Sequence, residues 1–221
     1  MALDMVSPDP DLSRRLSSGD RDDMEPQLRA MLDDKLIRWR EGEYRACSLA
    51  EVHAGLRNVF GTKGGQDAAI GSVRRLAGGS SKEQFVFEVT PAGAPGPQKM
   101  VLRMDPRGGT VETLRGREAE ILRAVRHAVP VPEVAFVDEI GRFFGRPAMI
   151  THWVDGVTSP SSDKSGLSGL GTAFPEALRP SLSRQFMECI AAVHALDFRD
   201  AELPSYAVPA AGTTQAALWQ V

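Results

Sequence analysis

The 221-residue sequence predicts an α+β fold built on a five-stranded antiparallel sheet with one helix inserted after the third strand. Two observations support this prediction. Short apolar or alternating segments recur between residues 70 and 154, and Gly or Pro residues bound them. Between the third and fourth of these segments, residues 110–128 carry apolar side chains at three- and four-residue spacing, which is typical of a helix.

Composition restricts the partners and the compartment. The hydrophobic fraction is 42%, and the net charge of −3 gives no reason to expect a nucleic acid or an anionic membrane as partner. The first 16 residues lack the apolar segment of a signal peptide, and no apolar run approaches the roughly 20 residues that span a bilayer. The expected compartment is the cytoplasm. Cys47 and Cys189 lack a C-x-x-C pattern, so we expect two reduced thiols.

The first 69 residues divide into two parts. Residues 1–24 are polar and are expected to form a disordered arm. Residues 25–69 are expected to be a helical extension, which could cover the sheet or mediate dimerisation. Its first helix is indicated by apolar residues at helical spacing, and its second, over 48–60, by the capping-box pair Ser48 and Glu51.

The predicted strands all lie within residues 70–156. The segments "AIGSVRRLAGG", "EQFVFEVT" and "KMVLRM" are separated by Gly- and Pro-rich turns, which predicts an antiparallel meander. The segments "VPEVAFVDE" and "RPAMITHWV" follow the inserted helix and are joined by the turn "IGRFFG". Residues 157–221 are expected to be a linker followed by helices, with one helix over 175–197.

The inserted helix is predicted from an apolar stripe. Gly116 weakens its middle, and Pro130 and Pro132 end it. The stripe consists of Val111, Leu114, Ile121, Leu122 and Val125.

Arg103 interrupts the apolar run of the third strand and therefore needs a partner if it is buried. Glu118, on the following helix, could pair with it across the face of the sheet. The alternative is an edge strand from which Arg103 reaches water.

A second candidate feature is the turn Gly78, Gly79, Ser80 and Ser81 between the first two strands. Free backbone amides and serine hydroxyls in such a turn can hold phosphate oxygens. A Gly-Gly turn can also be an ordinary hairpin.

Six stretches in order resemble the amino-terminal lobe of the aminoglycoside phosphotransferase-like kinases, in particular the branch that includes the kinase-like domains of acyl-CoA dehydrogenase fusion proteins. The stretches are "LAGGSSKEQFVFEV", "VLRMDP", "REAEILRAV", "VPVPEV", "GRPAMITHWVDGV" and "AAVHALD". The resemblance implies a protein-kinase-like N-lobe over 70–156 and the first helices of a truncated C-lobe over 157–221. It also implies ATP and Mg²⁺ as cofactors and a small-molecule hydroxyl as phosphoryl acceptor.

The resemblance also implies roles for individual residues. Residues 78–81 would cover the ATP phosphates, and Arg103 would contact the α- and β-phosphates where kinases usually carry lysine. Glu118 would orient Arg103, with Glu120 as the alternative if the helix is rotated. Thr151 would be the gatekeeper, and the His152 carbonyl and Val154 N–H would meet the adenine. His194 is expected to be structural.

The sequence has no His-Gly-Asp loop and no later Asp motif that could bind magnesium. No catalytic or metal-binding residue is therefore assigned. The ending "QAALWQV" has no helix stop signal, which favours a fragment of a kinase, with exposed apolar surface and a homodimer as its consequence. Two alternatives remain: a pseudokinase-like module that binds nucleotide or a partner without catalysis, and a structural protein with no nucleotide site.

Overall fold

The computed structural model describes residues 29–30, 32–33, 46–64, 68–76, 82–105, 114–156, 176–197 and 199–206. Within them, five strands form one antiparallel sheet in the spatial order β1-β2-β3-β5-β4. The strands are β1 (Ala69–Arg75), β2 (Glu83–Thr90), β3 (Gln98–Met104), β4 (Val134–Asp138) and β5 (Ala148–His152). Helix α4 (Arg115–Val125) follows β3, which confirms the predicted α+β plan and the kinase-like arrangement that the resemblance implies.

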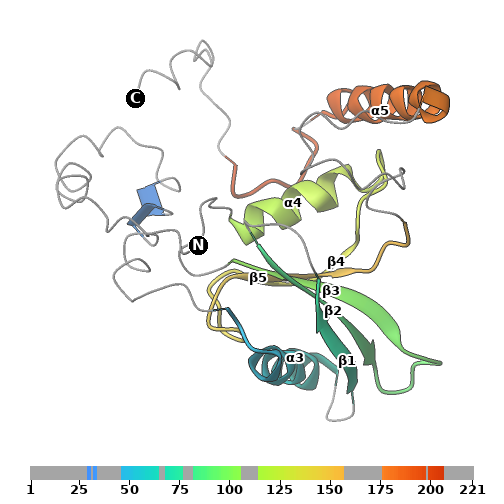
Figure 1. Cartoon of the computed structure of the whole chain (residues 1–221). Helices are drawn as coiled ribbons and strands as arrows, with labels where there is room; N and C mark the ends of the chain where they lie inside the picture. Colours follow the sequence, from blue (N-terminus) through green and yellow to red (C-terminus); the bar gives the residue numbers. More distant parts are fainter. Residues whose placement is uncertain are drawn as a thin grey trace, which may run out of the picture.

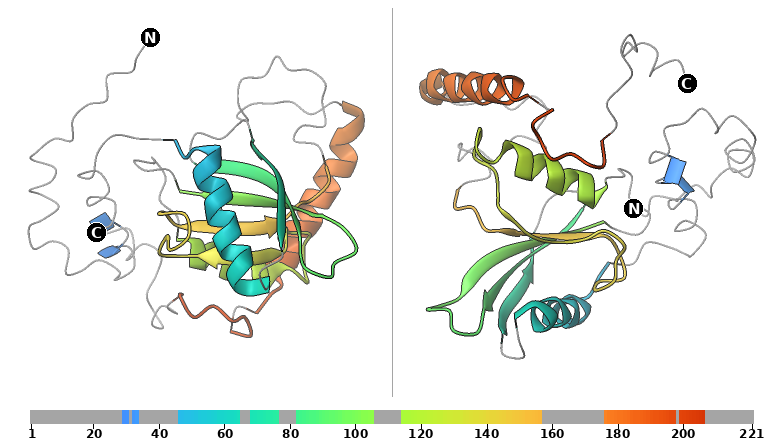
Figure 2. Two further views of the ribbon diagram at one scale, coloured as in Figure 1. Left: turned by 90° about the horizontal axis from the view of Figure 1, so that it is seen from below. Right: turned by 180° about the vertical axis from the view of Figure 1, so that it is seen from behind.

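Two helices cover the two faces of this sheet. Figure 1 shows α4 on one face and α3 (Leu49–Gly64) on the other, and the two views of Figure 2 agree. Strand side chains alternate between the faces, so each strand contributes one set of residues to each helix-covered layer. The helical extension therefore covers the sheet, one of the two roles expected for it.

Helix α3 begins where the capping box predicts. The Ser48 backbone N–H donates to Glu51 Oε2 at 2.8 Å, and the Glu51 N–H donates to Ser48 Oγ at 3.2 Å. These reciprocal bonds satisfy amides that the first turn of a helix would otherwise leave unpaired. Residues 29–30 and 32–33 of the first predicted helix are helical.

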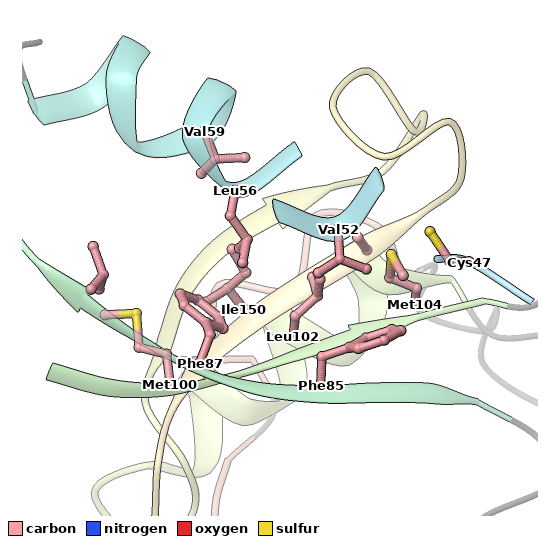
Figure 3. Close-up of a cluster of buried hydrophobic side chains, with 12 residues drawn as sticks. Cys47, Val52, Leu56, Val59, Phe85, Phe87, Met100, Leu102, Met104 and Ile150 are labelled. Carbon is pink, nitrogen blue, oxygen red and sulfur yellow. The ribbon is translucent and has the colours of Figure 1, made fainter. Parts of the chain in front are cut away.

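The apolar core lies between α3 and the sheet. Figure 3 shows Val52, Leu56 and Val59 of α3 pointing toward side chains from β2, β3 and β5. The strand residues of this core are Phe85, Phe87, Val89, Met100, Leu102, Met104, Ala148 and Ile150. The alternation of Phe85, Phe87 and Val89 with Gln84, Val86 and Glu88 predicts a half-buried strand, and the first three residues are indeed buried. Val86, on the other side of this alternation, is also buried.

The inserted helix differs from its prediction at both ends. It begins at Arg115, because Leu114 has extended backbone with φ −87° and ψ 114°, and it ends at Val125. Gly116 consequently lies in the first turn rather than the middle. Ile121, assigned to the buried stripe, is exposed. The buried positions are Arg115, Gly116 and Ala119, so α4 meets its surroundings through small residues and one arginine.

A short 3-10 helix η1 (Glu176–Leu178) leads into helix α5 (Arg179–His194), within the region predicted to be helical. No residue of α5 is buried, and Phe186 and Met187 are among its exposed apolar side chains. No helix in the described part of the chain has the length and apolarity that crossing a membrane requires. The arm over 1–24 lies outside the described residues, and the domain boundaries remain predictions.

Candidate functional site

Arg103 lies on a central strand and is paired. Strand β3 runs between β2 and β5, so the edge-strand alternative is wrong. The core residues Met100, Leu102 and Met104 face α3, which turns Arg103 toward the face covered by α4. There Arg103 Nη1 donates to Glu118 Oε1, so the predicted ion pair across the sheet face is confirmed.

This ion pair is open to solvent. The side chain of Arg103 is 31% exposed and that of Glu118 is 25% exposed. Among the described residues, Glu118 is the one partner found for Arg103. A guanidinium carries five N–H donors, so Arg103 has donors left for an anion that approaches this face.

Glu118 has a second arginine partner, which is completely buried. Arg115 Nη1 donates to Glu118 Oε2, and the Arg115 side chain is 0% exposed. The same guanidinium donates from Nε, at 3.0 Å, and from Nη2 to Oδ1 of Asp105, the residue directly after β3. Arg115 therefore bridges the end of β3 and the first turn of α4.

Asp105 extends this set of ion pairs toward the glycine-rich turn. Lys82 Nζ donates to Asp105 Oδ1 at 2.8 Å, and both side chains are buried. Lys82 directly follows the turn 78–81 in the sequence. We call the set Lys82, Asp105, Arg115, Glu118 and Arg103 the ionic chain. It contains three cations and two carboxylates.

Apolar residues lie in register beside Arg103 on the same face of the sheet. Val86 pairs with Val101, and Val101 pairs with Thr151, across β2, β3 and β5. Val86 and Thr151 are buried and Val101 is half-buried. Met149, the β5 partner of Arg103, is also buried. These residues form an apolar surface next to the cation, and Thr151 was the only one of them assigned from the sequence.

The last residue of β5 and the residue after it are hydrogen-bonded to two other parts of the sheet region, Glu133 just before β4 and Lys99 on β3. The His152 N–H donates to the Glu133 carbonyl at 2.9 Å, and the Trp153 N–H donates to the Lys99 carbonyl at 3.0 Å. Lys99 Nζ lies 3.7 Å from the centre of the Trp153 ring. No partner for the Val154 N–H is found among the described residues. This amide, on a fixed backbone, can donate to a ligand.

Glu120 binds Ser205 and not Arg103. It accepts hydrogen bonds from the backbone N–H of Ser205, at 3.1 Å, and from its hydroxyl. Arg117 donates to the Ser205 carbonyl at 2.8 and 3.1 Å and lies over the Tyr206 ring. The partner of Arg103 is thus Glu118 rather than Glu120, and the chain after α5 is fastened to α4.

The structure leaves two further assignments untested. Gly78, Gly79, Ser80 and Ser81 lie outside the described residues, so their proposed contact with phosphates stays a prediction. His194 ends α5 and lines a cavity of about 320 Å³ with apolar residues such as Val129, Phe186 and Ile190. Its predicted structural role also remains a prediction.

Sequence reasoning missed Lys82, Asp105 and Arg115. One signal was present, because Arg115 and Glu118 have the i, i+3 spacing at which helical side chains meet. The contacts of Asp105 join residues 10 and 23 positions apart, and no local pattern predicts such contacts.

Comparison with known proteins gives one family. The model of the phosphotransferase enzyme family matches residues 72–219. A solved protein of Ralstonia eutropha JMP134, provisionally described as an aminoglycoside phosphotransferase, resembles the chain at 22% identity with a TM-score of 0.49. That match covers 76% of this chain and 43% of the solved one, so this chain spans less than half of its length. Among curated proteins, none matches.

Proposed function

The chain belongs to the phosphotransferase enzyme family, and we propose that it supplies the nucleotide-binding lobe of an ATP-dependent kinase acting on small-molecule hydroxyl groups. The observation that carries the proposal is the paired, partly exposed Arg103 on a central strand beside an apolar surface. A cation that is held in place and still has free donors is suited to phosphate oxygens.

The described residues fit a nucleotide. Arg103 offers guanidinium donors on a side chain that is paired and partly exposed, which favours an anion. The half-buried Val101 offers an apolar contact to a base, with the buried Val86 and Thr151 on either side of it, and the Val154 N–H offers a donor to the edge of the base. ATP, when bound, would supply the phosphoryl group. The residues of this chain would bind and orient it, because positioning is the main protein contribution in phosphoryl transfer.

The described residues offer less to Mg²⁺. They include no group of three or more His, Cys, Asp or Glu side chains that could hold a metal ion. The two carboxylates of the ionic chain already bind cationic side chains.

The second candidate function is a nucleotide-binding or partner-binding module without catalysis. It is favoured by one observation: the 221 residues contain no His-Gly-Asp loop, the segment that would accept or orient the proton of the acceptor hydroxyl. Nucleotide binding is shared by both candidates, so it is the property to test first.

The variant Arg103→Met tests the nucleotide site. We expect it to weaken binding of Mg·ADP to residues 1–221 by about tenfold or more, because hydrogen bonds to charged groups contribute roughly 1.5–3 kcal/mol. Isothermal titration calorimetry measures the dissociation constant.

Arg75→Met is a matched control for this test. Arg75 is also a strand arginine paired with a glutamate, since its Nη1 lies 2.8 Å from Glu83 Oε1. Its guanidinium lies over Phe85, a residue of the core on the α3 side, so it should leave the affinity for Mg·ADP unchanged. Equal affinities for wild-type protein and Arg103→Met would contradict the proposed site.

A further inference from the structure

We propose that Arg115 is a positioning residue, which holds the Glu118 carboxylate where it fixes Arg103 for nucleotide. This inference rests on the proposed function. It concerns a residue that donates to Glu118 and Asp105 and that acts on Arg103 through Glu118.

The first argument is that the two oxygens of the Glu118 carboxylate bind two different arginines. Oε2 accepts from Arg115 and Oε1 accepts from Arg103, so each oxygen has its own arginine. A quarter-exposed glutamate without a second anchor would have several rotamers available, and ordering it would oppose ligand binding. With Oε2 held by a buried group, Oε1 is already directed at Arg103.

The second argument is the burial of Arg115. A guanidinium that is 0% exposed is costly unless its donors are satisfied, and here the donors reach two carboxylates on two different elements. Nε and Nη2 bind Asp105 at the end of β3, and Nη1 binds Glu118 on α4. Arg115 thus sets the first turn of α4 against the strand that carries Arg103.

The third argument is the link to Lys82. Asp105 Oδ1 accepts from both Lys82 and Arg115, so the residue that follows the turn 78–81 is joined to the same anchor. The positions of Arg103 and of the start of β2 are therefore set by one buried carboxylate.

Arg115→Lys is the informative substitution. Lysine keeps the positive charge, but one ammonium cannot reproduce the planar fork that spans two carboxylates. If charge alone mattered, the substitution would have little effect on nucleotide affinity. If the fork orients Glu118, the affinity should fall although Arg103 is intact.

The experiment is a double-mutant cycle on residues 1–221 with Mg·ADP as the ligand. We expect Arg115→Lys to raise the dissociation constant about three- to tenfold in the wild-type background. In a Glu118→Gln background, the same substitution should change it less than about twofold, because Arg115 acts through the Glu118 carboxylate. Circular dichroism establishes that each variant is folded. If Arg115→Lys is unfolded, Arg115→Met takes its place, since Asp105 then keeps Lys82 and Glu118 keeps Arg103 as a cationic partner.

The outcomes separate the two proposals. An unchanged dissociation constant in Arg115→Lys, or an equal loss in both backgrounds, would overturn the positioning role and leave the nucleotide site standing. No binding of Mg·ADP by the folded wild-type chain at millimolar concentration would overturn the proposed function and the positioning role together.

Discussion

At the scale of single residues, Cys47 combines an enclosed thiol with a backbone held by charged groups. Its N–H donates to Glu83 Oε1 at 3.0 Å and its carbonyl accepts from Arg75 Nη2 at 2.6 Å. The side chain is buried within the core under α3. Burial raises the pKa of the Cys47 thiol, against the opposing effect of Arg146 and with a smaller contribution from Glu51. Glu83 adds to the rise.

This raised pKa predicts a pH dependence of stability. As the pH rises, the unfolded chain loses the Cys47 proton first, near the ordinary thiol pKa of about 8.5, while the folded chain keeps it. The free energy of unfolding should therefore fall as the pH rises from about 8 toward the raised pKa. Urea denaturation at several pH values measures this slope, and Cys47→Ala should reduce it.

Cys189→Ala provides the control for this slope. Cys189 lies on α5, outside the core that contains Cys47. Its removal should leave the wild-type slope in place. A slope that is identical in wild-type protein and Cys47→Ala would show that burial of this thiol has no influence on stability above pH 8.

A contact between two residues could be predicted where the sequence itself placed a charged side chain in an unfavourable position. Arg103 in an apolar strand demanded a partner, and the next helix offered carboxylates such as Glu118, so an ion pair between the two elements was predictable. Lys82 and Asp105 flank strands at positions where charged residues are ordinary. Their burial results from α4 and β3 meeting in three dimensions, which their local sequence does not indicate.

At the scale of elements, α3 approaches the turn between β4 and β5 very closely. A Cβ placed on Gly55 would lie 2.4 and 2.6 Å from ring atoms of Phe144 and 2.9 Å from the Phe143 carbonyl oxygen. The turn itself is fixed by Asp138, whose carboxylate accepts from the Arg142 and Phe143 amides at 2.8 Å. The helix and a rigid turn therefore meet at a glycine.

Gly55→Ala should therefore destabilise the protein by about 1–3 kcal/mol, because the added methyl group must displace a packed ring or a backbone carbonyl. The midpoint of urea denaturation measures the effect. Gly61→Ala, on the same helix, is the matched control. Nothing lies within 4 Å of a Cβ at that exposed position, so it should stabilise by about 0.5–1 kcal/mol. Equal effects of the two substitutions would contradict the close packing at Gly55.

The elements also show which boundaries the sequence could predict. The start of α3 was predictable because Ser48 and Glu51 form a capping box from four consecutive residues. The start of α4 was not, because Leu114 forms no side-chain cap and the apolar spacing of Val111 extended the pattern backward. Periodicity assigned Ile121 to the buried side, whereas α4 packs through Gly116 and Ala119.

At the scale of the whole molecule, the large apolar cluster and the ionic chain lie on different faces of the sheet. Apolar side chains fill the space between the sheet and α3, whereas the ionic chain joins β3 to α4 on the other face. The number of strands and the place of the inserted helix along the sequence followed from alternation and turns. The spatial order of the strands, with β5 beside β3, did not, and it is this order that pairs Val101 with Thr151 and Arg103 with Met149.

For the chain as a whole, we expect nucleotide binding without phosphoryl transfer by residues 1–221. The reason is that neither a His-Gly-Asp loop nor a later magnesium-binding Asp motif occurs in the sequence. Release of ADP from ATP, in the presence of Mg²⁺ and a panel of small-molecule alcohols, provides the measurement. Turnover by the purified chain that disappears in Arg103→Met would refute this expectation while supporting the site itself.

The contrast between the two faces has a consequence for how this sequence can change over evolutionary time. An apolar layer accepts one substitution at a time, provided that volume is conserved, because its contacts are non-directional. The ionic chain does not, since loss of Asp105 alone would leave two buried cations facing each other. Descendants of this sequence should therefore drift independently at positions such as 56 and 150, and change in concert at 105 and 115.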